Sequence, residues 1–184
     1  AHKIYGPKGI GLLYKSERVR LTPLLYGSGK NNDLHPGTPS LPLIVALSKA
    51  IRIALNDLDK REHFIERLNE KICKDLENYK DIKINKTKYS IPHILNISLM
   101  NIKPETFIHA MEEQDVYLST NTACSSGDVS TSVMAIYNDK DRAVSSIRIS
   151  LSYVTTNEEI KELYSNYSSL LRRIVCLHKH GLAN

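Results

Sequence analysis

The first residues that could do chemistry are a histidine and a lysine beside a run of glycines. His2 and Lys3 precede the segment Gly6-Pro7-Lys8-Gly9-Ile10-Gly11. A lysine amine at such a turn could form a Schiff base or contact a phosphate. The glycines match neither a Walker loop nor a dinucleotide fingerprint. From residue types alone, an ordinary exposed lysine is the commoner interpretation of Lys3.

A second candidate is Thr38, which stands where a long helix is predicted to begin. Thr38 suits the N-cap, and Pro39 suits the first helical position because its missing N–H would have no partner there. The unpaired N–H groups and the positive dipole end of a helix favour anions. Thr38 could therefore contact a phosphate, cap the helix, or do both.

A third candidate is Cys124, which lies in Ser119–Gly127, a run of mostly small residues without apolar periodicity. This composition predicts an exposed loop, whereas free cysteines are normally buried. Access and thiolate fraction decide thiol reactivity, so Cys124 is a candidate nucleophile, and an incidental loop cysteine is an equal alternative. Cys73 and Cys176 lie beside apolar helical stripes, which predicts inert thiols.

The fourth candidate is Arg148, which interrupts the β-branched strand predicted at Ser146–Leu151. If that face is buried, the guanidinium needs a carboxylate or phosphate partner. Its rigid fork suits the bidentate binding of a substrate carboxylate. Alternation along the strand places Arg148 opposite Ile147 and Ile149, so exposure to solvent is also open.

The elements that must position these residues predict an α/β chain of two parts. Strands are expected at 10–14 and Val19–Leu25, ahead of a helix from Thr38 to about Tyr79. A charged segment, Asn56–His63, predicts a break or bend in that helix, which would tie two domains together.

The second part alternates short strands and helices. The last helix should start at a capping box, Thr156-x-x-Glu159, in which each side chain satisfies the other residue's backbone N–H. The remaining expected elements are strands at Ile94–Leu99, Val116–Ser119 and Ser146–Leu151, and a helix at Pro104–Gln114. In that helix Phe107, Ile108 and Met111 are expected to face inward. The expected core stripe of the last helix contains Ile160, Leu163, Tyr164, Tyr167, Leu171 and Ile174.

The composition limits the classes of function. The 184 residues are 41% hydrophobic and 24% charged, as in a globular protein, and no apolar run approaches the roughly 20 residues that span a membrane. The net charge of +5 comes from scattered bases without an aromatic platform, which argues against direct nucleic-acid binding. The three cysteines are far apart and form no metal-type pair or disulfide framework. With no secretion signal, the cytoplasm is the expected location.

Taken in order, these segments resemble the NifS/IscS-like cysteine desulfurases of the class V aminotransferases. His2–Gly11 resembles the segment that carries the cofactor lysine. The other matching segments follow in family order and are Pro36-Gly37-Thr38, Ala123–Gly127 and Ser145–Leu151. The chain departs from the usual family pattern at His35, at Gly27–Asn31, and at Asn121 and Thr122.

The resemblance implies a role for each candidate. Lys3 would bind pyridoxal phosphate covalently and move protons at the substrate Cα, and His2 would help hold the cofactor phosphate. Thr38 would reach the phosphate bound in the other subunit of a homodimer. Arg148 would clamp the carboxylate of L-cysteine. Cys124 would take the substrate sulfur as a persulfide and release L-alanine.

The resemblance also implies the fold and the partners. The chain would be the C-terminal part of a fold-type I pyridoxal-phosphate-dependent transferase, with residues 1–57 as a large-domain remnant with the linking helix and 58–184 as a small α/β sandwich domain. Family members are longer, so the chain alone is expected to be an inactive fragment. The full enzyme would pass sulfur to a scaffold protein for iron–sulfur cluster assembly or thiolation.

Two alternatives come from other classes of function. One is a non-catalytic module that dimerises or docks a scaffold protein. The other is a class V enzyme of different specificity, such as a selenocysteine lyase or an aminotransferase.

Overall fold

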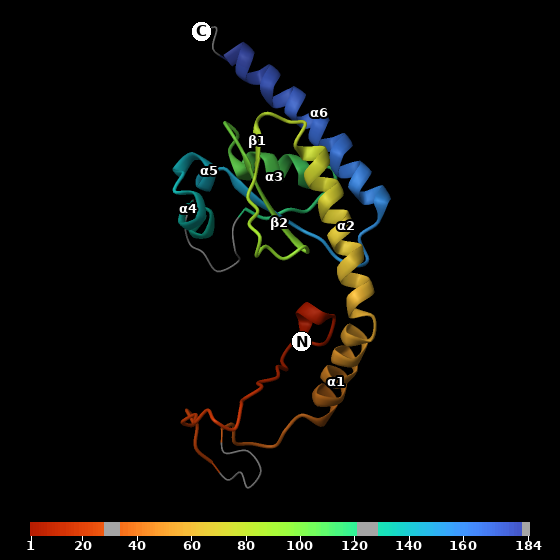
Figure 1. The fold of residues 1–184 in the computed structure, drawn as a ribbon, viewed down its shortest axis with the longest axis vertical. Helices are drawn as coiled ribbons and strands as arrows, with labels where there is room; N and C mark the ends of the chain where they lie inside the picture. The colour runs from red at the N-terminus through yellow and green to blue at the C-terminus, as the bar shows by residue number, and fades with distance from the viewer. Residues whose placement is uncertain (28–33, 121–128, 182–184) are drawn as a thin grey trace. The chain divides into compact units, whose positions relative to one another are not determined.

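The computed structural model describes residues 1–27, 34–120 and 129–181, with side chains described as far as residue 169. The chain divides into two compact units, Ala1–Asp59 and Lys60–Asn184. Figure 1 shows the course of the chain.

The first unit consists of a 3-10 turn, an extended segment and one long helix. The 3-10 turn η1 covers His2–Ile4 and packs against helix α1, Leu41–Asn56. Gly6 permits this contact, because a Cβ placed there would lie 3.0 Å from Cβ of Ala50, which is buried. A side chain at Gly6 would therefore push η1 away from the helix.

Both strands predicted in the first unit are wrong. Residues 10–14 and 19–25 form no strand, and Leu12, Leu13 and Tyr14 are 70%, 72% and 86% exposed. A strand needs a neighbour that takes up its N–H and C=O groups, and the described part of this unit contains no second strand. The apolar composition of both segments favours strands, but the described part of this unit offers no strand with which they could pair.

The predicted N-cap at Thr38 is also wrong, because α1 begins at Leu41 with Ser40 as its N-cap. A helix starting at Pro39 would need the N–H of Pro42 to bond to the carbonyl of Thr38, and proline has no N–H. Starting at Leu41 instead places Pro42 in the first turn, where no such bond is required. The first i to i−4 bond then runs from Ile44 N to Ser40 O, at 3.0 Å.

The predicted break in the long helix is confirmed. Helix α1 ends at Asn56, Asp57 has the non-helical angles φ −130° and ψ 35°, and helix α2 covers Leu58–Leu76. Helix α2 ends at Leu76, before Tyr79, where the long helix was predicted to end. The N–H of Tyr79 donates to Leu76 O in the turn that follows the helix.

The second unit is built on a three-stranded antiparallel sheet in the order β1-β2-β3. The strands are β1 Ile82–Ile84, β2 Ile94–Leu99 and β3 Ser146–Ser150. The strand predicted at Ile94–Leu99 is confirmed, and β3 ends one residue before the predicted Leu151. The strand predicted at Val116–Ser119 is reduced to a single bridge at Ser119. Strand β1 was not predicted.

Helices cover both faces of the sheet, which confirms the α/β class (Figure 1). The helices are α3 Pro104–Glu112, α4 Thr131–Tyr137, α5 Lys140–Val144 and α6 Asn157–Gly181, and α4 and α5 were not predicted. Helices α2, α3 and α6 share one core with the sheet. On the opposite face, the Ser98 hydroxyl donates to Arg142 O of α5 at 2.6 Å.

The core contains the side chains that the periodicity of α3 and α6 indicated. Phe107 and Met111 are fully buried, and Ile160 and Tyr167 of α6 pack into the same cluster. The Tyr167 ring stands edge-on to Phe107, with centroids 5.6 Å apart. Burial of these apolar side chains is the main force that holds the helices on the sheet.

The capping box at the start of α6 yields a stability prediction. Thr156 N donates to Glu159 Oε2 at 2.6 Å, and Glu159 N donates to Thr156 Oγ1 at 3.2 Å. Thr156→Ala should lower the free energy of unfolding by about 1 kcal/mol. Urea unfolding followed by circular dichroism measures the change, with the exposed Lys161→Ala as control.

The double variant Thr156→Ala/Glu159→Ala tests whether the two side chains act together. Its loss in free energy of unfolding should be smaller than the sum of the losses in the two single variants, because Thr156 and Glu159 cap the same helix terminus. Fully additive losses would contradict a reciprocal cap.

Candidate functional site

His2 and Lys3 lie together on η1 at the surface of the first unit. Both side chains are exposed, and no ion pair among the described residues includes either one. The turn is held by its backbone, since Ile4 N and Gly6 N both donate to Ala1 O at 3.0 Å. The amine of Lys3 is therefore presented on a defined turn and is accessible to a ligand.

The glycine segment after Lys3 runs along α1 toward the start of that helix. Gly6 approaches Ala50, and a Cβ on Gly9 would lie 4.0 Å from Cδ1 of Leu43, in the first turn. Gly9 has φ +85°, a conformation that residues with side chains rarely adopt. The same helix thus carries the lysine turn along one side and the predicted anion site at its N-terminus.

Thr38 is exposed and lies two residues before the N-cap of α1. The Ser40 side chain makes no capping hydrogen bond, so no side chain at the cap satisfies the first N–H groups of α1. Gly37, at φ +115°, turns the chain immediately before Thr38. A phosphate fits this arrangement, because it would accept from the free N–H groups and from the Thr38 hydroxyl.

Arg148 occupies the middle of β3 in the second unit, on the face opposite Ile147 and Ile149. It is half-buried, and Asn96 of β2 is its cross-strand neighbour in the antiparallel register. The guanidinium Nη2 donates to Ser119 Oγ at 3.3 Å, while Nε is buried without a hydrogen-bond partner. Arg148 therefore does not point freely into solvent, which was one of the two possibilities left open by the sequence. The guanidinium is half-shielded and has an unused donor.

Sequence reasoning missed the polar cluster on this face of the sheet. Arg142 donates from Nε to Asn85 Oδ1 and from Nη2 to Ile84 O at 2.8 Å, and its guanidinium stacks over the Tyr137 ring at 3.5 Å. Asn85 in turn donates to Asn96 Oδ1, next to Arg148. The signal was the alternation in β2, where polar Asn96 and Ser98 interrupt the apolar residues.

The three cysteines are described to different extents. Cys124 lies outside the described residues, and so does the side chain of Cys176. Cys73 is half-buried on α2, and its thiol donates to Asn69 Oδ1 at 3.5 Å. Burial raises the pKa of the Cys73 thiol, and the nearby Lys86 ammonium opposes this only in part. A raised pKa leaves little thiolate at neutral pH, which agrees with an inert thiol.

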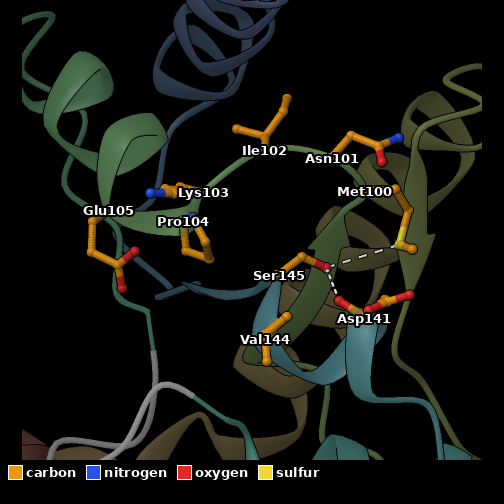
Figure 2. Close-up of a pocket in the computed structure, with 9 residues that line it drawn as sticks. All are labelled: Met100, Asn101, Ile102, Lys103, Pro104, Glu105, Asp141, Val144 and Ser145. Atoms are coloured by element: carbon orange, nitrogen blue, oxygen red, sulfur yellow. Dashed lines mark hydrogen bonds between the residues drawn. The ribbon is translucent and has the colours of Figure 1, made fainter.

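A pocket of about 530 Å³ lies elsewhere in the second unit, between the segment that leads into α3 and the end of α5 (Figure 2). Ser145 lines it, but its hydroxyl already donates to Asp141 O at 2.7 Å. None of the predicted site residues contributes to this pocket.

The described ranges contain neither a cluster of metal ligands nor a membrane-spanning helix. No group of three or more His, Cys, Asp and Glu side chains in them could hold a metal ion. No helix among those residues is both long and apolar enough to cross a bilayer.

Known proteins resemble the chain along most of its length. The family model of aminotransferase class-V matches residues 1–163. A NifS/IcsS protein homolog of Lactobacillus delbrueckii subsp. bulgaricus is 35% identical over 98% of the chain and 48% of its own length. The mitochondrial cysteine desulfurase of Saccharomyces cerevisiae is 34% identical over 87% of the chain and 33% of its own length.

A solved NifS-like protein has a similar structure. It matches with a TM-score of 0.79 and 30% identity, over 92% of this chain and 44% of that one. The chain thus spans about half the length, or less, of the relatives that it matches.

Cys124 and Cys73 are predicted to differ in the rate at which their thiols are alkylated. We expect iodoacetamide to alkylate Cys124 faster than Cys73 in the folded protein at neutral pH, because the Cys73 thiol is half-buried and has a raised pKa. The rate at Cys73 should increase as the pH rises. Peptide mass mapping over time measures both rates, and the denatured protein is the control in which they should converge. Equal rates in the folded protein would contradict the interpretation of Cys124 as an accessible thiol.

Proposed function

This chain belongs to the aminotransferase class-V family, and we propose that the protein carrying it is a pyridoxal-phosphate-dependent cysteine desulfurase. The enzyme would convert L-cysteine to L-alanine and take the sulfur on Cys124. The observation that carries the proposal is Arg148, a half-buried guanidinium with an unused donor. Its hydrogen-bond partner, Ser119, is the first residue of Ser119–Gly127, the segment that contains Cys124. Relatives named as cysteine desulfurases, including the human one, support the same reaction.

The residues of the first unit fit the cofactor. The uncapped start of α1 and the exposed Thr38 hydroxyl offer donors for a phosphate, and the exposed amine of Lys3 offers a covalent attachment. His2 would add a further contact to the cofactor phosphate. When bound, pyridoxal phosphate supplies an electron sink for negative charge at the substrate Cα. Lys3 would hold and move the proton at that carbon.

Arg148 would bind and orient the substrate carboxylate. A guanidinium already shielded from water makes stronger hydrogen bonds to a carboxylate than a solvated one does. The Cys124 thiolate would then attack the sulfur of L-cysteine. One S–S bond forms as the Cβ–S bond breaks. The electron pair of the broken bond remains with Cβ, which takes up a proton to give L-alanine. The products are alanine and a persulfide on Cys124.

The proposal extends to domains and partners. Residues 1–57 would belong to the large domain and residues 58–184 to the small domain, close to the division after Asp59. A homodimer would bring Thr38 to the phosphate site of the other subunit, and exposed apolar residues on α1, such as Leu41 and Val45, are suited to contact another part of the assembly. A scaffold protein would accept the sulfur. A reducing compartment such as the cytoplasm suits this chemistry, because the accepting thiol must stay free.

Removing Lys3 and Cys124 in turn tests the proposed reaction in the protein expressed from its complete gene. Lys3→Ala should lose the cofactor absorbance that survives dialysis, whereas Cys124→Ser should keep it and lose persulfide formation and sulfide release from L-cysteine. Cys73→Ser is the matched control and should remain active. A wild-type protein that transfers amino groups without releasing sulfur, or that acts on selenocysteine independently of Cys124, would favour the other class V activities instead.

Arg148→Ala tests the carboxylate clamp. A charge-assisted hydrogen bond contributes about 1.5–3 kcal/mol, so kcat/KM for L-cysteine should fall roughly tenfold to a hundredfold. Arg148→Lys keeps the charge but not the fork, and should recover only part of the loss. A folded Arg148→Ala variant with kcat/KM within about twofold of wild type would remove Arg148 from the binding site.

A further inference from the structure

A row of polar residues crosses the sheet of the second unit on the face opposite the core. Asn96 on β2 and Arg148 on β3 are directly paired in the antiparallel register, so their side chains leave the sheet on the same face. Ser119 continues the row beyond β3, because it forms an isolated antiparallel bridge with Arg148. The guanidinium of Arg148 therefore stands between an amide and a hydroxyl.

The backbone holds Ser119 firmly next to Arg148. Arg148 N donates to Ser119 O at 2.7 Å, and Ser119 N donates to Arg148 O at 3.2 Å. This reciprocal pair is independent of either side chain, so it survives substitution of both. The Ser119 hydroxyl is thereby kept within reach of the guanidinium, which it meets at Nη2, 3.3 Å away.

We propose that Ser119 is a positioning residue that sets the orientation of the Arg148 guanidinium for the amino-acid carboxylate. This inference rests on the proposed function. Asn96 accepts from Asn85, so it is engaged on the side away from Ser119. No ion pair among the described residues includes Arg148, which leaves the Ser119 hydroxyl as the side-chain contact that orients it there.

The orientation matters because an arginine side chain has many rotamers. Losing that freedom on substrate binding costs free energy, and a residue that restricts the rotamers beforehand reduces the cost. Ser119 would thus favour binding of the carboxylate without touching the reacting atoms. Its effect should appear in KM and not in kcat.

The test compares Ser119→Thr with Ser119→Val in the cofactor-loaded protein from the complete gene. Threonine and valine have almost the same shape and differ in the hydroxyl, so any strain from the branched side chain is common to both. Ser119→Val should raise KM for L-cysteine about fivefold with kcat within about twofold, and Ser119→Thr should stay within about twofold of wild type in both. Calorimetric binding of L-alanine should weaken by the same factor in the valine variant. Ser165→Ala, an exposed serine on α6, is the control.

The outcomes separate this inference from the proposed function. Equal KM values for the valine and threonine variants, with an active wild type, would overturn the role of Ser119 alone. A fall in kcat together with a lower melting temperature in both variants would show a structural role only, and would also overturn it. A wild type that forms no alanine from L-cysteine would overturn the desulfurase proposal. In that case the difference in L-alanine binding between valine and threonine still decides whether Ser119 positions Arg148.

Discussion

The burial of Ile147 and Ile149 is the constraint on which the candidate site in the second unit depends. Both side chains lie in the core shared with α2, α3 and α6, and alternation along β3 then forces Arg148 onto the other face. A slip of one residue would turn the guanidinium into an apolar core and expose both isoleucines, so the packing of the core specifies the register strongly. The same register pairs Arg148 with Asn96 and, through the bridge, with Ser119.

Most polar groups on the face of the sheet that carries Arg148 form hydrogen bonds with one another. Arg142 is bound to Asn85 and Ile84 O and is stacked on Tyr137, and Ser98 is bound to Arg142 O. These bonds attach α5 to the sheet and leave little freedom to the strand beside it. Arg148 differs from Arg142 because its Nε remains buried without a partner. The two arginines on this face thus have different environments, because Arg142 uses both Nε and Nη2 in hydrogen bonds, whereas Nε of Arg148 is buried without a partner.

The first unit depends on backbone constraints more than on a core. Pro42 decides where α1 can begin, and Gly6 lets the lysine turn approach Ala50. In contrast, the apolar residues of 10–14 remain exposed, because the described part of the unit has no strand to cover or pair with them.

Features that depend on neighbours along the chain could be predicted from the sequence. The capping box at Thr156, the inward face of Pro104–Glu112, the break near Asp57 and the strand at Ile94–Leu99 all follow from local spacing, and the family followed from short ordered motifs. The pairing of the strands, the start of α1 and the contact of Ser119 with Arg148 across 29 positions could not be predicted and are seen only in the folded chain. The reason is physical: hydrogen-bond partners of a strand and neighbours of a buried charge come from distant parts of the chain, and no local pattern records them.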